Sequence, residues 1–180
     1  MADSPLHERL RIFRPVPDAS QLASQLFLES FGAAFPVPAE RSLPIPTPPS
    51  AWRQYVATYR WPAGAEETVG FCNWIRYRDV YLQGGMCVRR TFYKNMPREH
   101  FRELQQRGGL AQMMMAVAER ELNDCVAWFG YCGDAKALAV DLRAGYVKTH
   151  RPYIIVKWFN QPPEAEQQRL IDDIVKVGPF

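Results

Sequence analysis

Apolar and polar residues alternate in several short stretches of the first half of the chain. Alternation at every second residue is typical of a strand with one buried face, and it predicts strands over 10–14, 52–61, 68–77 and 80–89. The last three follow one another with short turns between them, so we expect a three-stranded meander. Ahead of this meander, apolar residues at helical spacing predict a helix that ends at Gly32.

In the second half of the chain both periods occur, so helices and strands are expected to intermix. The predicted helices cover 97–106, 110–123, 134–144 and 163–177, and the predicted strands cover 126–131, 146–149 and 153–159. The whole order, β-α-β-β-β-α-α-β-α-β-β-α, predicts an α/β fold with a mixed sheet. A chain of 180 residues is most simply one domain, 1–180, closed by the C-terminal amphipathic helix 163–177.

A proline-rich segment, 35–50, separates the first predicted helix from the meander. It contains six prolines, which makes a helix or a central strand implausible. We expect an extended connector here, and a proline-rich ligand for another domain is the alternative.

Composition excludes several classes of function. The formal net charge is +3, from 22 Lys and Arg and 19 Asp and Glu, so we expect no nucleic-acid partner. The sequence has neither an apolar stretch of membrane-spanning length nor a signal peptide, which predicts a cytoplasmic protein without membrane contact. The four cysteines and three histidines show no zinc-binding spacing, so no metal is predicted and reduced thiols are expected.

The turn between two predicted helices is the strongest local signal of function. It reads Gln106-Arg107-Gly108-Gly109-Leu110-Ala111. Backbone N–H groups at a helix start are unsatisfied and lie at the positive end of the dipole, so such a turn suits a phosphate or pyrophosphate. The same residues also fit an ordinary helical hairpin in which Gly108-Gly109 ends the first helix.

The order of elements, Met86-Cys87-Val88, this turn and the segment 134–146 together resemble the GNAT superfamily of acyl-CoA-dependent N-acyltransferases. The resemblance implies a single domain with a central, mostly antiparallel sheet flanked by helices. It also implies a cofactor, acetyl-CoA or another acyl-CoA, and a bulge at Gly84-Gly85 beside the thioester. The implied cofactor-binding residues are Met86, Cys87 and Val88 for pantetheine, Gln106, Arg107, Gly108, Gly109, Leu110 and Ala111 for pyrophosphate, and Asp134.

The implied catalytic residues depart from the family pattern. Asp141 stands where the family has a tyrosine that protonates the leaving thiolate. A carboxyl with a pKa near the ordinary value of about 3.9 cannot donate a proton at neutral pH unless burial raises that pKa. Tyr131, at the end of a predicted strand, and Tyr93 are alternative acids.

A second departure is the insertion 89–105, which precedes the phosphate turn. It would act as a lid or substrate wall, or it would displace the turn. Within it, His100 is either a general base or, as a lone histidine on a polar helix, a surface residue. Cys132 is either an acylated nucleophile or a structural thiol, and the run 113–115 of methionines is expected to fill the core.

The sequence therefore predicts an N-acyltransferase, and an N-acetyltransferase in particular. Its partners would be a CoA thioester and a small-molecule or peptide amine, which attacks the thioester directly. A homodimer is compatible with this reading. The alternatives are a GNAT-fold protein that binds acyl-CoA without transferring the acyl group, and an interaction module without a cofactor.

Overall fold

The structure is a computed structural model that describes residues 5–15, 19–32 and 48–180. Most of the predicted connector 35–50, namely 35–47, lies outside the described residues. Its last residues enter a short 3-10 helix, η1 (Pro49–Ala51).

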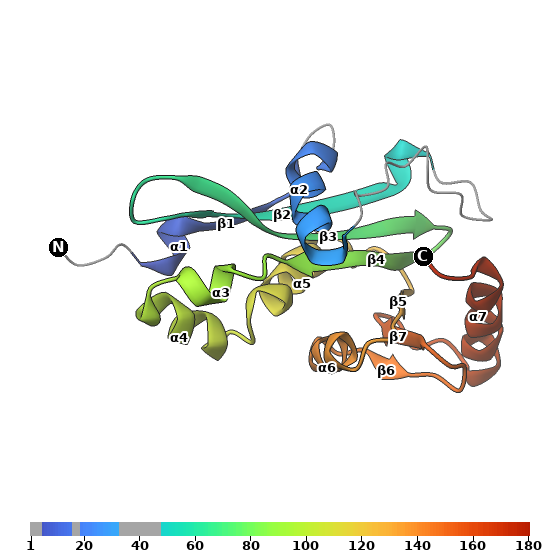
Figure 1. Cartoon of the computed structure of the whole chain (residues 1–180). Helices are drawn as coiled ribbons and strands as arrows, with labels where there is room; N and C mark the ends of the chain where they lie inside the picture. Colours follow the sequence, from blue (N-terminus) through green and yellow to red (C-terminus); the bar gives the residue numbers. More distant parts are fainter. Residues whose placement is uncertain (1–4, 16–18, 33–47) are drawn as a thin grey trace. The chain divides into compact units, whose positions relative to one another are not determined.

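A seven-stranded sheet, in the order β1-β2-β3-β4-β5-β7-β6, forms the centre of the fold (Figure 1). β4 and β5 run parallel, whereas β1 and β2, β5 and β7, and β6 and β7 run antiparallel. This confirms the predicted mixed, mostly antiparallel sheet. The strands are β1 (Leu10–Phe13), β2 (Trp52–Arg60), β3 (Glu66–Tyr77), β4 (Val80–Val88), β5 (Ala127–Tyr131), β6 (Val147–Lys148) and β7 (Ile154–Trp158).

Each predicted helix is present, and two short ones were not predicted. The helices are α1 (Leu6–Arg9), α2 (Ser20–Phe31), α3 (Phe92–Asn95), α4 (Arg98–Gln106), α5 (Leu110–Glu121), α6 (Ala135–Arg143) and α7 (Glu164–Val177). α2 ends at Gly32 in the left-handed conformation, as predicted. α1 and α3 span four residues each, too few for a helical period to appear in the sequence.

The chain divides into two compact units. The first consists of Met1–Phe35, Gln54–Cys72 and Met86–Ala118, and the second of Pro36–Arg53, Asn73–Gly85 and Glu119–Phe180. The single domain 1–180 stays a prediction.

The core of the first unit is built where α5 and α2 meet the sheet. A Cβ atom on Gly70 would lie 2.7 Å from the sulfur of Met114, so the missing side chain lets α5 approach β3 closely. Phe27 and Phe71 pack edge to face, 5.1 Å apart. Of the methionine run predicted to fill the core, Met114 and Met115 are buried, whereas Met113 is half-buried.

The core of the second unit is aromatic. Trp74 and Trp128 have ring centroids 4.9 Å apart, and the indole N–H of Trp128 donates to the carbonyl of Leu122. Strand β5 is buried from Ala127 to Gly130, which confirms the prediction of a strand covered on both faces. Among the described residues, no helix is long and apolar enough to cross a membrane.

Candidate functional site

In the first unit, the turn between α4 and α5 is closed by backbone hydrogen bonds. Gly108 and Gly109 both have positive φ, 83° and 92°. The N–H of Gly109 donates to the carbonyl of Leu104 at 2.8 Å, and the N–H of Gly108 donates to Gln105 at 2.9 Å. The hydrogen bond from Gly109 to Leu104 is the one that defines a Schellman motif. The two glycines therefore end α4 as they would in a helical hairpin.

The next N–H of the turn is bound by a side chain of the predicted insertion. Tyr93, in α3, accepts a hydrogen bond from the backbone N–H of Leu110 at 3.1 Å. Burial raises the pKa of Tyr93, and the hydrogen bond from Leu110 lowers it by less. Thus an oxygen atom lies at the first N–H of α5, where the sequence predicts a phosphate oxygen.

The remaining predicted cofactor-binding residues of this unit differ in exposure. Gln106 is exposed at the end of α4, and Arg107 forms an ion pair with Glu103 at 2.8 Å. Met86 and Val88 are half-buried in β4, whereas Cys87 is buried, and burial raises the pKa of its thiol to about 12. Burial of the thiol leaves the backbone of Cys87 as the part of this residue that the predicted pantetheine contact would use.

His100 is not a surface residue, which corrects the expectation for a lone histidine on a polar helix. Only 2% of it is exposed, and its Nδ1 lies 2.6 Å from the hydroxyl oxygen of Tyr59 on β2. α4 therefore buries one polar side chain in its apolar face, where the hydrogen bond to Tyr59 compensates for lost solvation.

In the second unit, β4 and β5 separate partway along their length. Their parallel ladder pairs Val80 with Ala127 and ends with the pair of Gln83 and Gly130. The following residue of β4, Gly84, has no partner on β5 in the described ladder. Strands that separate leave backbone N–H and C=O groups available to a ligand.

Tyr131 ends β5 and is 40% exposed. Its ring lies 5.8 Å from that of Tyr153, which is also exposed and has a positive φ of 66°. Positive φ is rare for an aromatic residue, and such strain often lies near functional sites. The structure thus leaves the predicted catalytic tyrosine accessible.

Asp141 is buried in α6, as it must be to serve as an acid. Its Oδ1 accepts a hydrogen bond from Gln83 at 3.2 Å. Burial raises the pKa of Asp141, and hydrogen bonds from Gln83 and Cys132 lower it by less. Burial and the charge of Asp141 raise the pKa of Cys132 to about 11, which disfavours the thiolate that a nucleophile needs.

Asp134 has a structural role in the fold. It is the N-cap of α6, and its Oδ1 accepts hydrogen bonds from the N–H groups of Lys136 and Ala137 at 3.0 and 2.8 Å. The carboxylate of Asp134 is thus already bonded to the first N–H groups of α6. Its contact with pantetheine remains a prediction.

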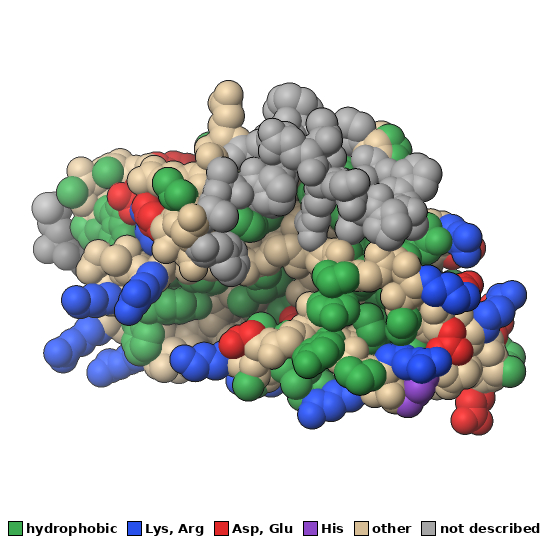
Figure 2. All heavy atoms as spheres, turned by 45° about the vertical axis from the view of Figure 1, so that its right-hand side comes forward, with side chains coloured by type: hydrophobic (Ala, Val, Ile, Leu, Met, Phe, Trp, Pro, Cys, Tyr) green, Lys and Arg blue, Asp and Glu red, His purple; other side chains and the backbone are tan. Residues whose placement is uncertain are grey.

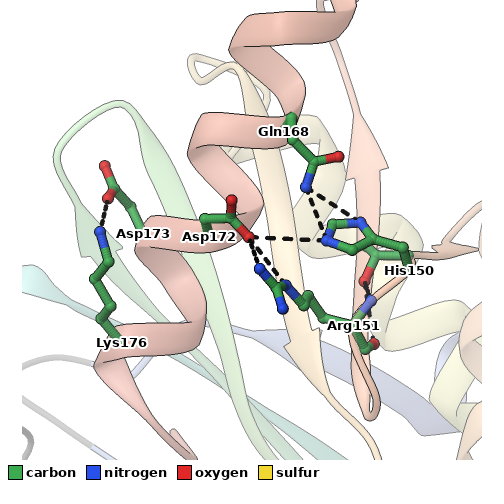
Figure 3. Close-up of polar contacts among 7 residues, drawn as sticks. His150, Arg151, Gln168, Asp172, Asp173 and Lys176 are labelled. Atoms are coloured by element: carbon green, nitrogen blue, oxygen red, sulfur yellow. Dashed lines mark hydrogen bonds and ion pairs between the residues drawn. The ribbon is translucent and has the colours of Figure 1, made fainter.

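A pocket of about 430 Å³ lies between the N-terminus of α6 and the β6–β7 hairpin, which lie side by side in Figure 1. Its walls are formed by 132–135 and 148–155, with Leu138. Arg151, which is one of the pocket residues, donates two hydrogen bonds to Asp172 of α7, at 2.6 and 2.9 Å (Figure 3). Basic and acidic side chains intermix on this part of the surface (Figure 2).

No group of three or more His, Cys, Asp or Glu within the described ranges could hold a metal ion.

Sequence reasoning missed the polar residues around the end of the β4–β5 ladder. Asn73 is fully buried on β3, and neither atom of its amide has a hydrogen-bond partner among the described residues. Gln83 is 8% exposed, and its Oε1 likewise lacks one. A polar residue inside an apolar strand was the available signal, but its environment depends on neighbouring strands.

Solved structures match this fold. The ribosomal-protein-S18-alanine N-acetyltransferase from Escherichia coli matches with a TM-score of 0.59 at 11% identity, over 86% of this chain and 97% of that one. A protein from Desulfovibrio desulfuricans assigned to the GNAT family of acetyltransferases matches with a TM-score of 0.51 at 13% identity, over 83% and 99%. The chain therefore has a GNAT-like fold, which confirms the predicted resemblance at the level of fold.

A looser match is a GNAT family acetyltransferase from Brucella melitensis in complex with acetyl-CoA. Its TM-score is 0.46 at 12% identity, over 87% of this chain and 93% of that one, too low to add to the assignment. No protein-family model and no curated protein matches the sequence.

Proposed function

We propose that this chain is an acyl-CoA-dependent N-acyltransferase that uses acetyl-CoA or another acyl-CoA. The observation that carries the proposal is the end of the β4–β5 ladder at Gln83 and Gly130 within a GNAT-like sheet. Beyond that pair, β4 continues with Gly84 and Gly85, which carry no side chains of their own to shield their backbone. An open strand with accessible N–H groups suits a ligand that carries amides and a thioester carbonyl.

The turn after α4 fits phosphate groups on one condition. Two of its N–H groups close α4, and the N–H of Leu110 donates to Tyr93. The contact to Tyr93 is the one that a phosphate oxygen could replace without unwinding α4. Phosphate binding at this turn therefore requires the side chain of Tyr93 to move.

Acyl-CoA would supply a thioester, in which an attacking amine forms a C–N bond as the C–S bond breaks. The amine loses a proton and the sulfur gains one. Asp141 is proposed to hold the proton for the sulfur, because burial raises its pKa and so favours the neutral, protonated carboxyl. Tyr131 is the alternative donor, since its side chain is accessible at the end of β5.

The alternative function is acyl-CoA binding without transfer. It is favoured by the carboxyl of Asp141 at the position where the family has a tyrosine, and by the cysteine thiol beside it, whose pKa of about 11 makes it a poor nucleophile.

A thermal-shift titration with CoA, acetyl-CoA and longer acyl-CoAs tests both functions, because a ligand that binds the native state raises Tm. If none of them raises Tm, both cofactor proposals fail. Release of free thiol from a bound acyl-CoA in the presence of an amine panel then separates transfer from binding.

A matched pair of variants tests the turn itself. Ala111→Asp places a negative charge in the first turn of α5, where it favours the helix dipole but repels phosphate. Ala111→Asn has nearly the same shape without the charge. We expect weaker CoA binding for the aspartate variant alone. Equal binding by both variants would exclude this turn as the phosphate site.

A further inference from the structure

We propose that the side-chain amide of Asn73 binds an amide or carbonyl group of the ligand at the point where β4 leaves β5. This inference rests on the proposed function, and it assigns a contact to a residue outside the implied GNAT motifs. Asn73 would be a positioning residue and takes no part in proton transfer.

The position of Asn73 is defined by Gly84. A Cβ atom on Gly84 would lie 2.6 Å from Nδ2 and 2.8 Å from Oδ1 of Asn73. Any side chain at Gly84 would therefore displace the amide. Gly84 is also the first residue of β4 after the ladder pair of Gln83 and Gly130. The amide of Asn73 thus lies over the backbone where the two strands part.

The amide of Asn73 is in an energetically unfavourable state. It is 0% exposed, and both its oxygen and its nitrogen lack a hydrogen-bond partner among the described residues. A buried polar group without a partner costs about 1–3 kcal/mol, and native proteins contain few of them. An amide that keeps both a donor and an acceptor unused in the core has the groups needed to pair with a ligand.

A second amide lies on the other face of the same strand. Successive side chains of a strand point to opposite faces, so Gln83 points away from the face on which Asn73 covers Gly84. Its Nε2 donates to Asp141, but its Oε1 has no partner among the described residues. Unsatisfied amide atoms therefore flank the end of the ladder on both faces of β4.

An amide is complementary to another amide, because each offers one N–H donor and one C=O acceptor. In the proposed reaction, this group belongs either to the pantetheine arm of CoA or to a peptide acceptor. Pantetheine and a peptide offer the same amide donors and acceptors. CoA affinity and KM for peptides, measured separately, distinguish the two.

The test compares wild type with Asn73→Leu, which keeps a similar shape and removes both polar atoms. Affinity is measured for CoA and for adenosine 3′,5′-bisphosphate, which lacks pantetheine. Thiol release from acetyl-CoA is measured with a mixture of short peptides that have free amino termini. Thr58→Val is the matched control, because Thr58 also has a buried hydroxyl without a partner among the described residues, on β2.

If Asn73 binds pantetheine, we expect Asn73→Leu to weaken CoA binding about tenfold and to leave binding of the bisphosphate unchanged. If it binds the acceptor, CoA affinity stays the same and KM for the peptides rises by a similar factor. Unchanged CoA affinity and unchanged KM would overturn the inference while the proposed function stands. Absence of CoA binding by wild type would remove both.

A stability measurement separates this role from a structural one. Replacing an unpartnered buried amide with an apolar side chain should leave Tm unchanged or raise it, whereas loss of a structural hydrogen bond would lower Tm. Should the leucine variant fail to fold, NMR of wild type replaces it. The side-chain amide resonances of Asn73 are then expected to shift on addition of CoA or peptide, and fixed resonances would overturn the inference.

Discussion

The hydroxyl oxygen of Tyr93 lies 3.1 Å from the backbone nitrogen of Leu110 and accepts its hydrogen bond. This contact joins the predicted insertion 89–105 to the turn that the sequence marks for phosphate. A Cβ atom on Gly109 would lie 3.4 Å from the same hydroxyl, an ordinary van der Waals distance, so it is the positive φ of 92° that favours glycine here. The insertion therefore acts on the first donor of α5 directly, and ligand and tyrosine compete for one N–H group.

We expect Tyr93→Phe to increase the affinity for CoA, because it frees the N–H of Leu110 for a phosphate oxygen. The variant should also lose about 0.5–1.5 kcal/mol of stability with the hydrogen bond. Calorimetric titration with CoA and urea denaturation measure the two effects. Phe101→Leu, which alters the ring beside Tyr93 but keeps the hydroxyl, is the control. Weaker CoA binding by Tyr93→Phe would indicate that the hydroxyl contacts the ligand instead.

Asp141 should make stability fall as pH rises. Burial raises its pKa in the folded chain above 3.8, so the native state holds this proton more tightly than the unfolded state. The free energy of unfolding that this proton contributes is fully present below pH 3.8, the pKa in the unfolded chain. It is lost as the pH rises through the higher pKa of the folded chain. Asp141→Asn removes this dependence, and we expect it to gain about 1–3 kcal/mol at neutral pH. Urea denaturation from pH 3 to pH 8 checks the sign, and a parallel offset at all pH values would contradict it.

Cys132 should react slowly with alkylating reagents despite being partly exposed. Its pKa of about 11 leaves roughly one thiol in ten thousand ionised at pH 7. The rate should therefore rise about tenfold for each pH unit. Asp141→Asn removes the charge that Asp141 carries once it is deprotonated, so labelling at alkaline pH should accelerate. Mass spectrometry of iodoacetamide-treated protein measures the rate, and Cys132→Ala identifies the signal. Equal rates in the two backgrounds would mean that Asp141 does not control the thiol.

The loop of the β6–β7 hairpin should depend on Arg151. Its two hydrogen bonds to Asp172 lower the pKa of that carboxyl, and His150 and Gln168 lie beside it (Figure 3). The stabilisation from a lowered pKa is present above the ordinary value of 3.8 and is lost as pH falls through the folded value.

We expect Arg151→Gln to speed amide hydrogen exchange in 149–153 without a measurable change in global stability, because the pair is exposed. Lys176→Gln breaks the neighbouring pair with Asp173 on α7 and serves as the control. Faster exchange in both variants would mean that the loop responds to charge on α7 in general.

The sequence predicted β2, β3 and β4 well because these strands are long enough for the alternation of apolar and polar residues to be recognised, and turn residues lie between β3 and β4. Short elements such as α3 gave no such signal. His100 was misjudged because α4 is polar almost throughout, so its narrow buried face could not be recognised without β2. Asn73 was overlooked because its lack of partners depends on Gly84, which lies opposite it only once β3 and β4 have paired.

The early end of the β4–β5 ladder has a consequence for backbone dynamics. β4 has β3 and β5 as its sheet neighbours, and its pairing with β5 stops at Gln83. In the rest of β4, alternate N–H groups point towards β3, and the others point to the side on which the described ladder with β5 has ended. Amide hydrogen exchange along 84–88 would then alternate between slow and fast. A ligand that bonds to the exposed N–H groups would slow the fast ones, and the alternation would disappear.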